Sequence, residues 1–282
     1  MNSQRTLLDR LEFAGVGLHT GLRTRAIVEP AEPNSGLVFR VPGGIEFPAT
    51  AEYVVETQRA TVLGSNGVTV STVEHLLSAL RGMGVDNALI AVDGGEVPAM
   101  DGSAKVFADA IDEVGTLEQG VPRKVFRPDR AMGFRDDDKT LAIIPSPSWR
   151  IKFTIDFAPP IGTQFFEGEI TPRIYRDEIA QARTFVYLHE VEALRERGLA
   201  LGGTLDNALV FAPSGPMTPL RWPNEPVRHK ILDMIGDFAL LGMYPQCEAV
   251  ALKSGHKLHA AVMAELRAAQ RASEIIAVEE EK

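Results

Sequence analysis

The sequence predicts an α+β fold. Short runs that alternate between apolar and polar residues, as half-buried strands do, are interspersed with helical patterns. These strands and helices do not follow one another in a regular βαβ order, which argues against a parallel α/β sheet. With 282 residues, 45% of them hydrophobic and 24% charged, the chain can form one large domain or two domains of ordinary size.

In the first half, alternation predicts strands over 45–55 and 88–92. Between them, the segment 71–74 (STVE) has the form of a capping box, and the apolar stripe that follows it predicts a helix ending near Gly82. A second helix is expected after Asp101-Gly102-Ser103.

A domain boundary is predicted near residue 122, because the stretch 115–138 is rich in glycine, proline and charge. This divides the chain into domains 1–122 and 123–282. The second half resumes with strand patterns over 141–144 and 150–157.

The rest of the second half is mainly helical by pattern. Helices are expected over 175–182 and 189–197, and a longer one begins with Pro226 in its first turn and ends at Gly242. A strand over 249–252 and a C-terminal helix follow. No internal sequence repeat is visible.

Charge and cysteine content exclude several classes of function. The net charge is −9 and no basic block occurs, which argues against a nucleic-acid-binding surface. The longest stretch without charge, 207–220, is too short to span a bilayer and contains three prolines. The first residues do not resemble a signal peptide, so a cytoplasmic location is expected. Because Cys247 is the only cysteine, any metal would need His, Asp or Glu ligands.

The predicted helix after Pro226 carries a row of polar residues on one face. His229 and Asp233 are four residues apart, and Asp237 follows one turn later. An i,i+4 pair of this kind can supply two metal ligands, but it is also a common surface contact. The whole row favours a site, because isolated buried charges are costly on an otherwise apolar helix.

Glu74 and His75 lie in the first turn of the first-half helix. Glu74 could simply cap that helix, and His75 could be a core histidine with one hydrogen bond. If His75 instead joined His229 and Asp233, the set would have the stoichiometry of a catalytic zinc site, in which three protein ligands leave one position for water. Glu74 could then take a proton from that water.

His256 follows the predicted strand 249–252 at the start of the last helix. A histidine in such a turn can protonate a leaving amine, although helix entry alone also accounts for it. Asp237 could hold this imidazole in its protonated form.

The segment GVGLHTG (15–21) resembles a nucleotide-binding loop only superficially. Its glycine spacing fits neither a Rossmann nor a P-loop motif, and no lysine follows in the P-loop manner. His19 could contact a ligand from this turn, although hairpin geometry alone explains the glycines.

Several separated motifs resemble one known family, the UDP-3-O-acyl-N-acetylglucosamine deacetylases of lipid A biosynthesis, LpxC. They occur in the family's order from residue 11 to about 266, so the resemblance covers nearly the whole chain. The motifs are GVGLHTG (15–21), STVEHLLSAL (71–80), PAMDGSA (98–104), ARTF (182–185), GLALGGTLDNALV (198–210), NEPVRHKILDMIGD (224–237) and SGHKL (254–258).

The resemblance implies two α+β domains of similar layered architecture, each with a small mixed or antiparallel sheet packed on helices, and an active site between them. It also implies a zinc amidase. The implied Zn²⁺ ligands are His75, His229 and Asp233. The implied catalytic residues are Glu74 as the base that activates water, His256 as the acid with Asp237 as its partner, Thr184 as an oxyanion donor, and Lys230 beside the substrate head group.

The resemblance further implies an apolar passage for the 3-O-acyl chain within an insert at about 186–206. A soluble enzyme needs such a passage to shield a long hydrocarbon from water. The implied substrate contacts are Phe185, Val191, Leu194, Ala200, Thr204 and Leu205 along the passage, Phe157 against uracil, and His19. Two positions depart from the family pattern: His259 stands where Asn is expected, and Thr204 where Ser is commoner.

The resemblance therefore implies hydrolysis of the N-acetyl group of an acylated UDP-amino sugar. The implied partner is this small molecule, with no nucleic acid and no membrane span, and a monomer is expected. Two other hypotheses stay open at this point. One keeps the metal but changes the substrate to another acylated amine. The other is a lipid or nucleotide-sugar binding module whose His and Asp residues are structural.

Overall fold

A computed structural model describes residues 3–280, with side chains described for residues 3–270, and confirms the α+β fold. The first half contains a five-stranded sheet in the order β2-β3-β9-β4-β5. Its strands are β2 (Leu11–Val16), β3 (Arg23–Pro30), β4 (Leu37–Val41), β5 (Ile45–Pro48) and β9 (Ala88–Asp93). Every neighbouring pair is antiparallel except β4 and β9, which are parallel.

The second half builds a sheet of the same topology, in the order β12-β13-β20-β14-β15. Its strands are β12 (Met132–Asp136), β13 (Lys139–Pro145), β14 (Arg150–Asp156), β15 (Thr163–Glu169) and β20 (Cys247–Leu252). Here β14 and β20 form the one parallel pair. In each sheet the last strand in sequence occupies the centre. The two halves thus share a layered architecture although no repeat is visible in the sequence.

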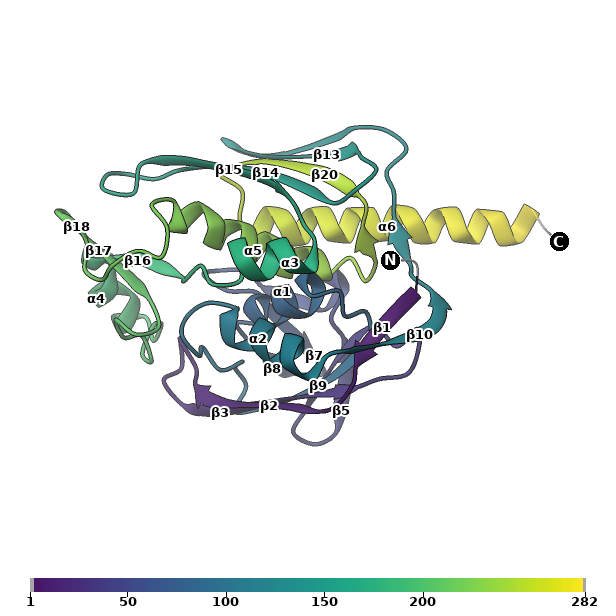
Figure 1. The fold of residues 1–282 in the computed structure, drawn as a ribbon, viewed down its shortest axis with the longest axis horizontal. Helices are drawn as coiled ribbons and strands as arrows, with labels where there is room; N and C mark the ends of the chain where they lie inside the picture. The colour runs from purple at the N-terminus through teal and green to yellow at the C-terminus, as the bar shows by residue number, and fades with distance from the viewer. Residues whose placement is uncertain (1–2, 281–282) are drawn as a thin grey trace.

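Helices fill the space between the two sheets (Figure 1). The first half contributes α1 (Glu74–Gly82) and α2 (Lys105–Val114), and the second contributes α5 (Glu225–Ala239) and α6 (His256–Glu280). All nine residues of α1 are buried, as is most of α5. One continuous hydrophobic core extends from the first sheet through these helices to the second sheet. None of the helices in the described part is long and apolar enough to cross a membrane.

Close approach of α1 and α5 depends on a glycine. A Cβ atom on Gly236 would lie 2.1 Å from the carbonyl oxygen of Glu74, far inside van der Waals contact. Because glycine has no side chain, the backbone of α5 can pass directly over the first turn of α1. This contact brings the polar row of α5 next to Glu74 and His75.

The remaining strands form small sheets outside the two five-stranded ones. They are β1 (Ser3–Leu7) with β10 (Thr116–Pro122), β11 (Val125–Phe126) with β19 (Tyr244–Pro245), β6 (Val54–Glu56) with β7 (Val62–Ser65) and β8 (Val68–Val70), and β16 (Phe185–Tyr187) with β17 (Leu209–Ala212) and β18 (Gly215–Pro216). The sheet β16-β17-β18 and α4 (Leu188–Glu196) lie together at one end of the molecule (Figure 1), and the predicted insert at about 186–206 belongs to this region.

Two predicted elements differ in detail. The strand expected over 45–55 is interrupted by a 3₁₀ turn, η1 (Ala51–Tyr53), because the amide of Ala51 bonds to the carbonyl of Leu240 instead of a neighbouring strand. The helix expected over 175–182 is a short α3 (Pro172–Ile174) followed by a π-helical turn, η2 (Tyr175–Ile179). There Tyr175 packs against Gly82 and its hydroxyl donates to Ser78 Oγ at 3.0 Å.

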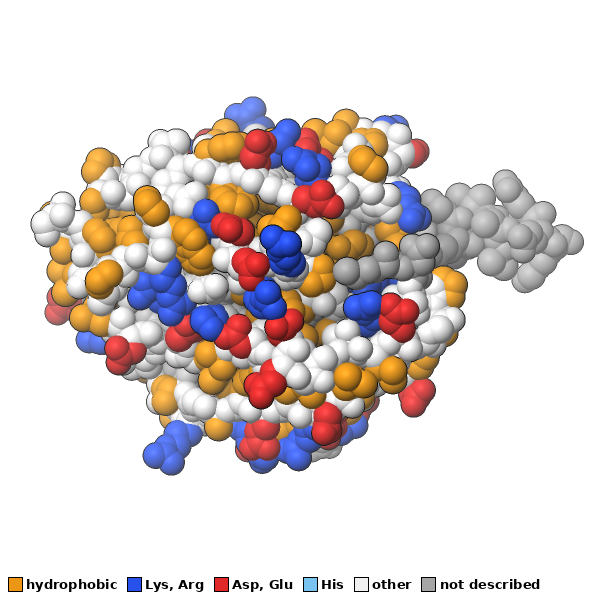
Figure 2. Space-filling model, in the orientation of Figure 1, with side chains coloured by type: hydrophobic (Ala, Val, Ile, Leu, Met, Phe, Trp, Pro, Cys, Tyr) orange, Lys and Arg blue, Asp and Glu red, His pale blue; other side chains and the backbone are white. Residues whose placement is uncertain are grey.

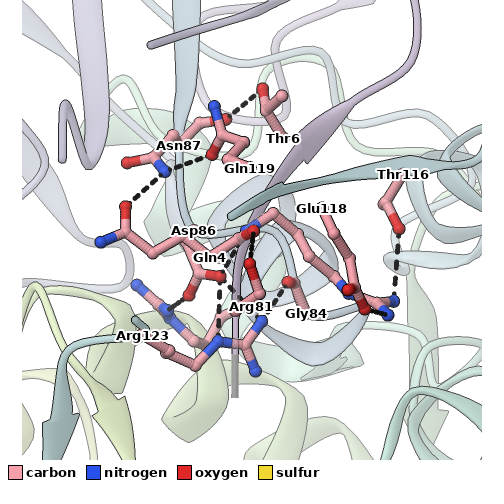
Figure 3. Close-up of polar contacts among 12 residues, drawn as sticks. Gln4, Thr6, Arg81, Gly84, Asp86, Asn87, Thr116, Glu118, Gln119 and Arg123 are labelled. Atoms are coloured by element: carbon pink, nitrogen blue, oxygen red, sulfur yellow. Dashed lines mark hydrogen bonds and ion pairs between the residues drawn. The ribbon is translucent and has the colours of Figure 1, made fainter. Parts of the chain in front are cut away.

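A buried polar network ties the segment near residue 122 to the first half (Figure 3). Asp86 Oδ2 accepts hydrogen bonds from Arg123 Nε at 2.9 Å and Nη2 at 2.8 Å, and Arg81 Nη1 lies 3.4 Å from Asp86 Oδ1. The Arg123 guanidinium also lies over the ring of Tyr244, at 4.6 Å from its centroid. Arg123 therefore links residues from both halves. The domain boundary near residue 122 itself stays a prediction.

Candidate metal centre and active site

His75, His229 and Asp233 come together between α1 and α5. One potential ligand atom from each lies within 4.8 Å of the other two. Asp233 Oδ1 is 3.7 Å from His75 Nε2 and 3.3 Å from His229 Nε2. All three side chains are buried. The i,i+4 pair on α5 is thus part of a buried cluster and not a surface contact.

The imidazoles of this cluster are suited to bind a cation. Burial lowers the pKa of His75 to about 3, with a further contribution from the neighbouring His229. Burial also lowers the pKa of His229, whose Nδ1 lies 3.0 Å from the carbonyl oxygen of Ala182. A hydrogen on that Nδ1 leaves the lone pair of Nε2 directed at the cluster.

Asp233 supplies the negative charge. Burial would raise the pKa of Asp233, but the nearby His229 and Lys230 outweigh burial and hold it well below its usual range. The Lys230 ammonium donates to Asp233 Oδ2 at 2.5 Å. Two neutral imidazoles and one carboxylate match the ligands that zinc prefers at catalytic sites.

Glu74 does not cap its helix, so the predicted capping box is wrong. Val73 occupies the N-cap position without a side-chain bond, and Thr72 has a φ of 56°. Glu74 Oε2 instead accepts the amide of Thr61 at 3.1 Å, and Oε1 lies 4.0 Å from His256 Nε2. Burial raises the pKa of Glu74 to about 7, although the charge of His256 opposes this.

His256 is the first residue of α6 and faces the same cluster. Its Nε2 lies 3.8 Å from Asp233 Oδ2, and its Nδ1 lies 2.8 Å from Asp237 Oδ2. Burial disfavours the charged imidazole, but the Asp237 carboxylate outweighs burial and raises the pKa of His256 to about 9. Burial also acts on Asp237 and would raise its pKa, yet the contacts with His256 keep that pKa low.

A cavity of about 290 Å³ opens beside these groups. Besides the cluster, its wall contains Lys230 and four further predicted site residues: His19, Phe157, Thr184 and Phe185. The rings of Phe157 and Phe185 meet edge to face with centroids 5.2 Å apart. The predicted residues from both halves of the chain therefore share one cavity.

A second cavity of about 320 Å³ adjoins the first and is lined largely by the insert. It shares His19, Thr184 and Phe185 with the first cavity, and the other predicted residues on its wall are Val191, Leu194, Ala200, Thr204 and Leu205. Hydrophobic side chains also gather on the surface at the left of Figure 2, where Figure 1 places the insert. Leu188, Leu201 and Met217 are among the exposed ones.

The glycine-rich turn 15–21 is anchored by a buried carboxylate. Glu96 accepts the amides of His19 and Thr20, each at 2.9 Å, and the hydroxyl of Thr72. A Cβ on Gly17 would lie 2.2 Å from Glu96 Oε2, so a side chain at that position would displace the Glu96 carboxylate. The turn is thus held close to the start of α1, with His19 on the cavity wall.

Thr61 and Glu96 are among the polar residues at the site that were not predicted from the sequence. Thr61 donates through Oγ1 to Asp237 Oδ1 at 2.7 Å, and Glu96 holds the glycine-rich turn. Neither residue lies in a recognisable motif. For Glu96, the only signal in the sequence is an acidic residue within an otherwise apolar and glycine-rich segment.

Comparison with known proteins gives a consistent result. Residues 4–268 match the family LpxC, described as UDP-3-O-acyl N-acetylglycosamine deacetylase. A protein from Syntrophotalea carbinolica is 45% identical over 262 residues, which cover 91% of this chain and 85% of that protein. One from Sulfurimonas denitrificans is 41% identical over 283 residues, covering 99% and 96%. Both relatives are named UDP-3-O-acyl-N-acetylglucosamine deacetylase.

Proposed function

This chain belongs to the LpxC family of UDP-3-O-acyl N-acetylglycosamine deacetylases, and from that membership we propose that it is a zinc-dependent amidase of lipid A biosynthesis. The reaction is hydrolysis of the N-acetyl group of UDP-3-O-acyl-N-acetylglucosamine. Water attacks the acetamide carbonyl, the carbon–nitrogen bond breaks, and acetate and the free amine leave.

Zn²⁺ is the proposed cofactor, held by His75, His229 and Asp233. The fit depends on the neutral state of both imidazoles and on the ionised carboxylate between them. When bound, the ion would supply Lewis acidity, which polarises a carbonyl and makes water more acidic. The candidate ligands number three, which is typical of catalytic zinc sites.

The chain's own residues supply the proton transfers. Glu74, as a carboxylate, takes a proton from the attacking water, and His256, as an imidazolium, gives one to the departing nitrogen. Asp237 keeps His256 charged and oriented through the bond at 2.8 Å. Thr184 lies on the cavity wall, where its hydroxyl can donate to the oxyanion that forms at the carbonyl.

The two adjoining cavities suit the two unlike parts of the substrate. The apolar cavity in the insert takes the 3-O-acyl chain along Val191, Leu194, Ala200, Thr204 and Leu205. The polar cavity takes the sugar, with Lys230 and His19 beside the head group and Phe157 against uracil. Phe157 has 36% of its surface exposed, so its ring is free for stacking on a base.

One observation supports this proposal most directly. A buried His, His and Asp cluster with an adjacent Glu and His lies beside an apolar cavity that is lined largely by the insert. A binding module with structural histidines would need neither a poised base nor a poised acid at this place.

The test is acetate release from UDP-3-O-acyl-N-acetylglucosamine, together with the zinc content of the purified protein. We expect one zinc per chain and strong dependence of the rate on the acyl chain. Glu74→Gln should retain zinc and lower kcat by about 10² to 10⁴-fold. His75→Ala should lose both zinc and activity. Acetate release that continues in His75→Ala, or equal rates with and without the acyl chain, would refute the proposal.

A further inference from the structure

Ser254, His259 and Asp237 form a line of hydrogen bonds that ends at His256, and Thr61 also donates to Asp237, through its other carboxylate oxygen. Ser254 Oγ lies 2.7 Å from His259 Nε2, and His259 Nδ1 lies 2.8 Å from Asp237 Oδ2. That same carboxylate oxygen lies 2.8 Å from His256 Nδ1. Asp237 Oδ2 therefore accepts from two imidazoles, and only one of them, His256, lies on the wall of the cavity.

The direction of each hydrogen bond follows from charge. Ionised Asp237 can only accept, so both histidines must carry hydrogen on Nδ1. Burial lowers the pKa of His259, which is completely inaccessible to solvent, so its Nε2 is a bare acceptor. The Ser254 hydroxyl must then donate to that Nε2. The donor and the acceptor of each hydrogen bond in the line are therefore assigned. Neutral His259 donates a hydrogen bond to Asp237 without adding a positive charge.

This line is not a second nucleophilic site. Ser254, His259 and Asp237 follow the bonding order of a hydrolase triad, but Ser254 is only 4% exposed. Neither Ser254 nor His259 lies on the wall of the cavity that contains His256. A substrate carbonyl therefore cannot approach the hydroxyl.

The ring of His259 is also fixed by packing. Phe153 of β14 and Phe238 of α5 each meet it edge to face, with centroids 6.4 Å and 6.3 Å away. His259 and His256 are three residues apart on α6, so they project from the same face of that helix. The second sheet, α5 and the loop before α6 thus all hold one imidazole against Asp237.

We propose that His259 is a positioning residue for the reaction, with Ser254 as its anchor. Its Nδ1–H fixes Asp237 Oδ2 at the orientation in which that oxygen also holds His256, and so keeps His256 Nε2 directed at the cavity. The kinetic part of this inference rests on the proposed function. The hydrogen-bond directions do not, and they can be measured without any substrate.

The first experiment is NMR of the ¹⁵N-histidine-labelled protein, because imidazole nitrogen shifts report which ring nitrogen carries hydrogen. We expect His259 as the neutral form with hydrogen on Nδ1 alone. We expect Ser254→Ala to remove that preference. Hydrogen on Nε2 of His259 in the unaltered protein would overturn the inference, because the line would then be reversed.

The second experiment compares His259→Asn with His259→Leu. The Asn amide nitrogen is as far from Cβ as Nδ1 of histidine, so it can still donate to Asp237, whereas Leu fills space without a donor. We expect kcat to fall about 10-fold or more in His259→Leu with KM unchanged, and to recover in His259→Asn. Equal kcat in both variants, whatever their thermal stability, would contradict a positioning role.

The two proposals fail in different ways. Protein that releases no acetate refutes the proposed function and leaves the NMR spectra to decide the role of His259. In that case, loss of the His256 Nδ1–H signal in His259→Leu supports positioning, and an unchanged signal overturns it. Should His259→Leu not fold, Ser254→Ala takes its place in both measurements, because it removes a single oxygen atom.

Discussion

Glu74 and His256 face each other across the cavity with pKa values of about 7 and about 9. Glu74 acts as a base only when ionised, which requires a pH above its pKa. His256 acts as an acid only when protonated, which requires a pH below its pKa. We therefore predict a bell-shaped dependence of kcat/KM on pH, with limbs near these two values.

The acid limb should move or vanish in Glu74→Gln, and the alkaline limb in His256→Gln. Initial rates of acetate release across pH 5–11 provide the measurement. A profile without an alkaline limb would contradict the assignment of His256 as the acid.

Cys247 lies in the second sheet with 1% of its surface exposed. Burial raises the pKa of its thiol to about 12, so the folded protein keeps it protonated near neutral pH. We predict that a thiol reagent such as a maleimide leaves Cys247 unmodified at pH 8 and labels it after unfolding in urea. Because the folded-state pKa is raised, stability is also expected to fall as pH rises from about 9 towards 12. Rapid labelling of the folded protein would contradict this environment.

Residue types and spacing were enough to predict candidate site residues, but they did not show which of these residues lie close together. His229, Asp233 and Asp237 follow from helical spacing on α5, and the family resemblance adds His75 from α1. Thr61 and Glu96 could not be predicted, since they act through contacts with residues far away in sequence. The alternative roles of Glu74 were separable only once its carboxylate was located.

At the scale of elements, the contact between α1 and α5 determines where Glu74, the proposed base, lies. A Cβ on Gly236 would overlap the carbonyl oxygen of Glu74 at 2.1 Å. We predict that Gly236→Ala separates the helices, lowers the free energy of unfolding by about 1–3 kcal/mol and moves Glu74. A displacement of about 1 Å at a catalytic group can reduce the rate about 100-fold.

Gly133→Ala is the matched control, because a Cβ on Gly133 of β12 meets nothing within 4 Å. Urea denaturation and acetate release should be measured for both variants. If Gly236→Ala behaved like the control in both measurements, the close approach of α1 and α5 would not matter for the site.

Long helices with a clear hydrophobic periodicity could be predicted from the sequence. The residues and contacts at their ends could not. The helix after Pro226 follows from its apolar spacing and is present as α5. The sequence at 71–74 favours a capping box, yet tertiary contacts use Glu74 and Thr72 elsewhere. Similarly, the pattern over 175–182 gives a π-helical turn because Tyr175 is held against Gly82 and Ser78. Local sequence preferences for a cap or a helix are weak enough that tertiary packing readily overrides them.

At the scale of the whole molecule, the network around Asp86 joins the two halves (Figure 3). Removal of its carboxylate would leave the buried guanidinium groups of Arg81 and Arg123 without this counter-charge. We predict that Asp86→Ala lowers the free energy of unfolding by about 3–5 kcal/mol, measured by urea denaturation.

Asp112→Ala serves as the control, since its ion pair with Arg176 is exposed and should contribute little. If the two variants lost the same free energy of unfolding, the buried Asp86 network would contribute no more to stability than an exposed ion pair. The family resemblance implied two domains of similar layered architecture, but residue patterns alone did not predict the repeated strand order of the two sheets, because similar topologies do not require similar sequences.

The division of the candidate ligands between α1 and α5 has a consequence for how the protein would respond to the proposed zinc ion. Of the three candidate donors, α1 supplies one and α5 supplies two, so binding of an ion by all three is thermodynamically linked to the packing of α1 against α5. An ion that bridges them acts as a reversible cross-link and raises the melting temperature with its concentration. Conversely, a substitution far from the ligands that weakens the contact between the two halves, such as Asp86→Ala, should lower the affinity for the ion although every ligand is retained.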